Sequence, residues 1–215
     1  KHEREQAVKW TNIAVDTAKR VGASVVVIHA GTLEFEDVRN PKLFDLFVEG
    51  KKGTPEYQDE LNRILKKRKE LRMPYVDALD ESLTEVCSYA NSNDIQIGLE
   101  TRYYPMEMPN FDEIGYFLNK FSEKGMGYWH DVGHAEINDR LGIQPHKDFL
   151  EQYKTKLLGV HIHGMKGRRD HLAPFEGDMD LDQYLPCFKE DVIRVVESKP
   201  FADVELMKAA VKKLK

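Results

Sequence analysis

The segment GMGYWHDVGHA, residues 125–135, begins as an apolar β-strand and ends in polar residues that can bind metal ions. His130, Asp131 and His134 lie within a few residues of one another there. They belong either to a metal site or to a polar strand end that is rich in histidine, and the local sequence leaves both interpretations open. A metal site would need partners at the carboxyl ends of other strands, because these ends meet at one rim of a parallel β/α barrel.

Four other segments supply such partners. ASVVVIHAG (23–31) is a continuous β-branched run closed by glycine, which is typical of a strand buried on both faces of a parallel sheet. Further strands are predicted at IQIGLETRY (95–103), KLLGVHIHG (156–164) and DVIRVVES (191–198). The polar residues at the ends of the five strands are, in chain order, His29, Glu100, Asp131, the pair His161 and His163, and Glu197.

Helical patterns alternate with these strands. Helices are predicted at 3–20, 54–71, about 76–91, 109–121, about 146–154, after a loop that ends near 181, and from about Phe201. Strict β/α alternation predicts a parallel sheet covered by helices, either doubly wound or barrel-shaped. No Gly-x-Gly-x-x-Gly follows a strand, so the dinucleotide-binding version has no support. The barrel is favoured because its functional residues lie at the C-terminal ends of strands, as they do here.

Composition limits the class of protein. The 215 residues are 41% hydrophobic, which suits a single domain over 1–215. The net charge of −5 disfavours nucleic acid as a partner, since such proteins must neutralise phosphates. No apolar run approaches the ~20 residues that span a bilayer. Two cysteines, Cys87 and Cys187, are too few for a disulfide framework, so we expect a reducing, cytoplasmic location.

The strand-end residues are ordinary one by one and informative together. A lone His29 is more often structural than a ligand, and Glu100 or Glu197 alone could pair with a nearby Arg102 or Lys199. Carboxylates that converge with Asp131 at one barrel mouth would repel one another without a cation, and burial makes this costly. We therefore expect a shared divalent metal.

Two histidines need separate treatment. His130 should point away from Asp131 because side chains alternate along a strand, so we exclude it. His161 and His163 fall on one face, and one of them can hydrogen-bond to a metal ligand without binding the metal itself.

The ordered motifs GLETR, WHDVGHA, GVHIHG, RRDHLAPFEGDMD and RVVES resemble the xylose isomerase-like barrel family from about Gly22 to Ser198. That family includes sugar-phosphate isomerases and epimerases and the endonuclease IV type of apurinic-site nuclease. The resemblance assigns the metal to Glu100, Asp131, His161 and Glu197. It places His134 and His171 near the substrate or an additional metal, and His29 at the nuclease-type ligand position. His163 and Arg169 complete the set expected to bind substrate or additional metal.

The resemblance also implies a missing part. Members of the family have a (β/α)8 barrel, and the five visible units look like the fourth to the eighth, so the resemblance implies that the first three are absent from this chain. Five barrel strands do not close a ring, and a long open edge favours aggregation. We expect either that the chain is an N-terminally truncated or incomplete product, or that another copy covers the open edge as a homo-oligomer.

Three carboxylates and one imidazole suit one divalent ion, namely Mn²⁺, Mg²⁺ or Zn²⁺. Such an ion polarises a ketose carbonyl and its adjacent hydroxyl, and Glu100 and Glu197 would move a proton through an enediolate. The leading hypothesis is therefore isomerisation or epimerisation of a sugar, sugar phosphate or related polyol.

Two alternatives stay open. One is hydrolysis of apurinic-site phosphodiesters, although Arg169 stands where the related nucleases have a metal-binding Asp, and a guanidinium cannot ligate a metal. The other is a non-catalytic, metal-stabilised barrel fragment. Lys166, Arg168 and Arg169 would lie beside the metal mouth, either as a clamp for a phosphate or carboxylate or as a solvated basic loop.

Overall fold

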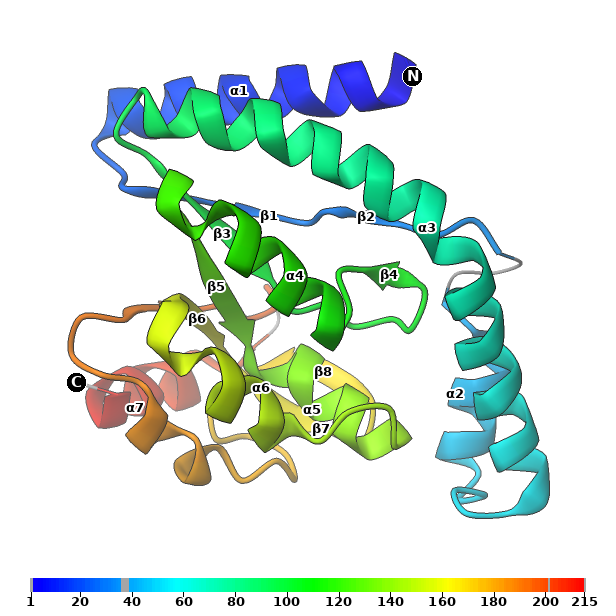
Figure 1. Cartoon of the computed structure of the whole chain (residues 1–215). Coiled ribbons are helices and arrows are strands. Elements are labelled where there is room, and N and C mark those ends of the chain that lie inside the picture. Colours follow the sequence, from blue (N-terminus) through cyan, green and yellow to red (C-terminus); the bar gives the residue numbers. More distant parts are fainter. Residues whose placement is uncertain (1, 36–38, 201, 215) are drawn as a thin grey trace.

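A five-stranded parallel sheet is the centre of the computed structural model, which describes residues 2–35, 39–200 and 202–214. The spatial order is β1-β3-β5-β6-β9, so the strands lie side by side in chain order, and Figure 1 labels the first four of them. Their bounds are β1 Val25–Ile28, β3 Gln96–Glu100, β5 Met126–Asp131, β6 Leu157–Ile162 and β9 Ile193–Val196. The prediction of five parallel strands is confirmed, and within the described residues the sheet is an open part of a barrel.

The register of the sheet brings the strand ends to one level. Glu100 pairs with Trp129 across β3 and β5, and Asp131 pairs with His161 across β5 and β6. Glycines in the strands make room for the Trp129 ring, because a Cβ on Gly159 would overlap it. The apolar strands thereby hold three polar side chains at the same rim.

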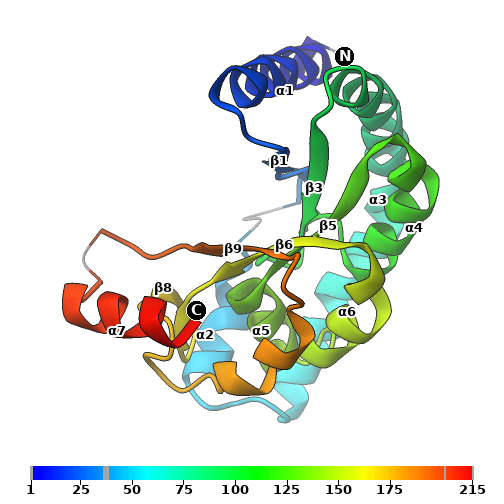
Figure 2. The same cartoon turned by 90° about the vertical axis from the view of Figure 1, so that its left-hand side faces the viewer.

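Helices cover the outer face of the curved sheet. Figure 2 shows α1, α3, α4 and α6 outside the strands. The helices are α1 His2–Val21, α2 Pro41–Val48, α3 Pro55–Asn91, α4 Phe111–Phe121, α5 Val132–Leu141, α6 His146–Tyr153 and α7 Val204–Leu214. None of the helices in the described part of the chain is long and apolar enough to cross a membrane.

Short elements shape the loops at the carboxyl rim. Two small antiparallel sheets are formed by β2 with β4 and by β7 with β8. Their bounds are β2 Gly31–Thr32, β4 Glu107–Met108, β7 Gly164–Lys166 and β8 Arg169–Leu172. Single 3-10 turns lie at Ser122–Lys124, Lys154–Lys156, Leu181–Gln183 and Leu185–Cys187.

Several predicted boundaries differ from the structure. The two helices predicted at 54–71 and 76–91 form one helix, α3, with Pro74 inside it. Proline removes one backbone hydrogen bond, but Ile64 on one side and Leu83 on the other are both buried against the core, which keeps the helix continuous. The helix predicted after residue 181 is wrong, since only the two short 3-10 turns form there. The terminal helix begins at Val204, and Phe201 lies outside the described residues.

Candidate metal centre

Four side chains from four strands converge at the carboxyl rim of the sheet. One potential ligand atom from each lies within 4.8 Å of the other three. Glu100 ends β3, Asp131 ends β5, His161 lies one residue before the end of β6, and Glu197 follows β9. These are the four residues to which the family resemblance assigns the metal, and we refer to them below as the metal group.

The geometry around His161 fits a cation. Its Nδ1 lies 3.0 Å from a Glu197 oxygen, 3.1 Å from a Glu100 oxygen and 3.7 Å from an Asp131 oxygen. One ring nitrogen carries at most one proton and cannot satisfy three carboxylates. A divalent ion shared by the four groups would offset two of the three carboxylate charges and accept the imidazole lone pair, so the donor set fits such an ion.

Glu100 is buried and has contacts at both carboxylate oxygens. Its side chain is 2% exposed, and its second oxygen lies 2.8 Å from Nε2 of His29. Burial would raise the pKa of Glu100, but hydrogen bonds with His161 and His29 outweigh it and lower the pKa to about 2. Glu100 is therefore ionised and held at both oxygens.

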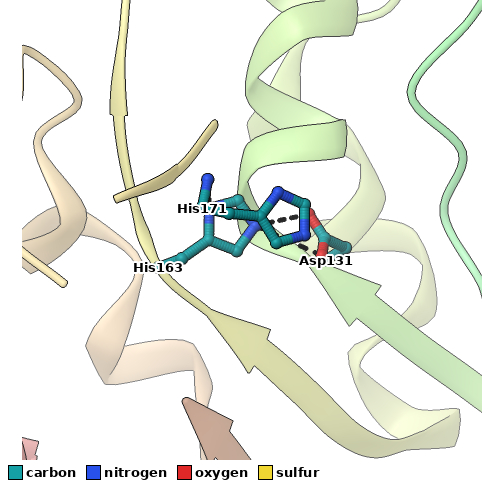
Figure 3. A group of neighbouring side chains, drawn as sticks. All are labelled: Asp131, His163 and His171. Carbon is teal, nitrogen blue, oxygen red and sulfur yellow. Dashed lines mark hydrogen bonds and ion pairs between the residues drawn. The ribbon is translucent and has the colours of Figure 1, made fainter. Parts of the chain in front are cut away.

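Asp131 is fully buried, and residues outside the metal group hold its carboxylate. Its Oδ1 accepts a hydrogen bond from the backbone N–H of His134 at 2.7 Å, which caps α5. Its carboxylate also contacts Nε2 of His163 at 3.1 Å. The His163 ring stacks on His171, with centroids 4.3 Å apart (Figure 3). Asp131 thus keeps one orientation without depending on the rest of the metal group.

The other predicted residues surround this group. Nδ1 of His134 lies 3.7 Å from oxygens of both Glu100 and Asp131 and 2.9 Å from the carbonyl oxygen of Thr101. Nε2 of His171 lies 3.6 Å from Glu197. Arg169 lines a cavity whose lining also includes Glu100 and Glu197. His130 points to the helix side, where it contacts His146 at 3.0 Å, as strand alternation predicts.

Sequence reasoning missed Asp170. Its carboxylate lies 3.1 Å from Nδ1 of His171 and 3.0 Å from Nζ of Lys199. The carboxylates of Asp170 and Glu197 raise the pKa of His171 to about 10. Asp170, His171 and His134 form another group with metal-ligating atoms close together. The signal was present, because an acidic residue directly precedes His171 in RRDH.

Comparisons with known proteins agree with this architecture. A family model described as a xylose isomerase-like TIM barrel matches residues 1–191. No curated protein matches the sequence.

Similar solved structures include three that are 13–21% identical to this chain. The IolI protein with a bound zinc atom is 19% identical, with a TM-score of 0.64 over 99% of this chain and 69% of its own. A D-tagatose 3-epimerase-like protein is 21% identical, with a TM-score of 0.62 over 98% of this chain and 68% of its own. The 3-keto-D-glucoside 4-epimerase YcjR from E. coli is 13% identical, with a TM-score of 0.61 over 96% and 69%. At these identities the likeness shows the fold alone.

Proposed function

The chain belongs to the xylose isomerase-like TIM barrel family, and from this premise we propose that it is a divalent-metal-dependent isomerase or epimerase of a sugar, sugar phosphate or related polyol. The observation that carries the proposal is the convergence of Glu100, Asp131, His161 and Glu197 on one point. We propose one Mn²⁺, Mg²⁺ or Zn²⁺ ion at that point. The zinc atom in the IolI structure and the sugar epimerases among the structural neighbours support this choice.

The two glutamates are suited to proton transfer. A bound divalent ion would polarise the substrate carbonyl and the neighbouring hydroxyl. Glu197 opens onto the cavity with a 43% exposed side chain, so it can reach a substrate carbon. Glu100 approaches from β3, separated from β9 by two strands. The pair can therefore take a proton from one carbon and return it through an enediolate.

Hydrogen exchange tests the proposal. The Mn²⁺-loaded chain is incubated with a panel of ketoses and ketose phosphates in deuterated water, and exchange of the hydrogen next to the carbonyl is followed. Glu197→Gln and Glu100→Gln should each slow exchange by about 10² to 10⁴. Glu190→Gln is a matched control, because Glu190 is exposed and is not a member of the metal group. If the wild-type chain binds metal but exchanges no hydrogen on any member of the panel, the mechanism is wrong.

A second candidate is metal-dependent phosphodiester hydrolysis at apurinic sites. It gains support from Asp170, which offers a carboxylate next to His171, although Arg169 stands at the position where the related nucleases have a metal-binding Asp. Metal counting separates the candidates: about three ions per chain favour the nuclease, one favours the isomerase, and none favours a non-catalytic barrel fragment. Chelator-sensitive cleavage of an abasic duplex by the purified chain would make the nuclease the better proposal.

A further inference from the structure

A cavity of about 700 Å³ lies in front of the metal group. Glu100 and Glu197 form one part of its lining, and basic residues from several loops form another. These residues, which we call the basic wall, are Arg39, Arg102, Arg168, Arg169 and Lys199. The chain as a whole carries a net charge of −5, so its composition does not explain a concentration of positive charge here.

Arg168 differs from its neighbours in the basic wall. Lys199 is paired with Asp170 at 3.0 Å, and Arg102 is paired with Glu107 at 2.6 Å. In the described part of the chain, the guanidinium of Arg168 has no carboxylate partner and no hydrogen-bond acceptor. It lies instead over the ring of Phe44, 5.7 Å from the centroid. Its N–H groups therefore remain available to a ligand.

Arg168 is also held in place. Its backbone carbonyl accepts a hydrogen bond from the Tyr103 hydroxyl at 2.5 Å. Tyr103 stacks on Phe44 with centroids 5.7 Å apart and an interplanar angle of 8°. Phe44 comes from α2, Tyr103 follows β3, and Arg168 lies between β7 and β8. The backbone of Arg168 is thus held by Tyr103, and its guanidinium is held by Phe44. A pre-positioned arginine loses less entropy when it binds an anion.

We propose that Arg168 binds a carboxylate or phosphate group of the substrate, at the end of the molecule remote from its carbonyl. The inference rests on the proposed function, because it assigns the carbonyl end to the metal group. A guanidinium binds either anion through two parallel hydrogen bonds. Arg102 and Lys199 add positive charge to the same cavity. The substrate class is then an anionic ketose, either a ketose phosphate or a ketouronate.

Calorimetric titration of the Mn²⁺-loaded chain tests the inference. D-Fructose, D-fructose 6-phosphate and D-fructuronate are compared on wild type, Arg168→Gln, Arg168→Lys and the control Arg20→Gln, whose side chain is exposed on α1. Wild type should bind a charged ligand about 10- to 100-fold more tightly than fructose. Arg168→Gln should remove this advantage, Arg168→Lys should reduce it, and Arg20→Gln should keep it. Preference for the phosphate or the uronate identifies the anion.

Equal binding of fructose and both charged ligands would overturn the inference and leave the proposed function intact. The same holds if the advantage persists in Arg168→Gln. If no ketose binds, the proposed function fails, and titration of the metal-free chain with inorganic phosphate decides the anion site independently. If phosphate binds and Arg168→Gln weakens this binding, the inferred anion site is supported. If phosphate does not bind, the inferred anion site is wrong.

Discussion

His163 illustrates how one buried residue can set the geometry of its neighbours. The backbone N–H of His171 donates to Nδ1 of His163 at 3.0 Å, and Nδ1 also lies 3.2 Å from the carbonyl oxygen of Gly164. Because a backbone N–H can only donate, we assign Nδ1 as the acceptor and place the proton of the neutral ring on Nε2. Nε2–H then donates to the Asp131 carboxylate. Gly133 leaves room for the ring, because a Cβ there would overlap His163. The histidine is therefore a positioning residue that joins Asp131 to the backbone at His171.

Replacing His163 should weaken metal binding without removing a ligand. His163→Leu fills the space with an apolar side chain and removes the His163 contact to Asp131, while the His134 N–H contact remains. Loss of such a partner costs about 10- to 100-fold in metal affinity. Mn²⁺ titration measures the change, with the exposed His2→Gln as control. Nitrogen-15 spectra of wild type should show the proton of His163 on Nε2. Unchanged affinity in His163→Leu, or a proton on Nδ1, would contradict the assignment.

The sequence predicted the strand-end residues more completely than the loop residues. Glu100, Asp131, His161 and Glu197 are brought together because parallel strands have a fixed side-chain period and carboxyl ends that meet at one rim. Loops have no such period. The contact of Arg168 with Phe44 depends on where α2 lies, and no pattern in the sequence predicted that helix.

At the level of elements, α3 is anchored by a buried ion pair. Arg68 on α3 binds both oxygens of Glu113 on α4, at 2.8 and 2.9 Å, and also contacts the carbonyl oxygens of Pro105 and Glu107. Glu113 in turn forms a capping box with Asn110 at the start of α4. A prediction from helix propensity ends the helix near Pro74, because it cannot include tertiary contacts. The contacts of Arg68 hold the long helix α3 to α4.

Removing one partner of this ion pair should be costly. Arg68→Met leaves a buried carboxylate, and such changes destabilise by about 3–5 kcal/mol. Arg72→Met is the matched control, because Arg72 lies 3.5 Å from the same Glu113 but its side chain is 36% exposed. Urea unfolding should show a much smaller loss for the control. Similar losses in both variants would show that the Arg68 contacts do not anchor α3.

The same pair predicts a pH dependence. Burial raises the pKa of Glu113, but the hydrogen bonds and charge of Arg68 lower it overall. The folded pKa lies below the unfolded one, so the stabilisation is complete above the ordinary glutamate range and is lost as the pH falls through the lowered value. Wild-type stability should therefore decrease in acid more than that of Arg68→Met. Parallel pH profiles of the two unfolding free energies would contradict this expectation.

At the scale of the whole molecule, the metal group links most of the sheet. Its ligands come from β3, β5, β6 and β9, whereas the described sheet ends at β1 and β9 without closing a ring. An ion bound by four strands would hold them at one rim, and its binding energy would add to the stability of the fold. The closed barrel and the homo-oligomer that would cover the open edge strands stay predictions from sequence. Both depend on strands or copies other than the five strands described.

Metal should therefore raise the melting temperature of the chain. At a free Mn²⁺ concentration of 100 times Kd, binding stabilises by about 2.7 kcal/mol, which corresponds to about 5–10 °C for a chain of this size. Asp131→Ala should abolish the shift, and it should also lower the metal-free melting temperature because Asp131 caps α5. Glu197→Gln gives a cleaner comparison, since Glu197 is partly exposed and its loss should reduce the shift with little effect on the metal-free chain. Glu190→Gln should keep the full shift. If Asp131→Ala retained the wild-type increase with Mn²⁺, the ion would bind elsewhere, and the link between the metal and the barrel rim would be wrong.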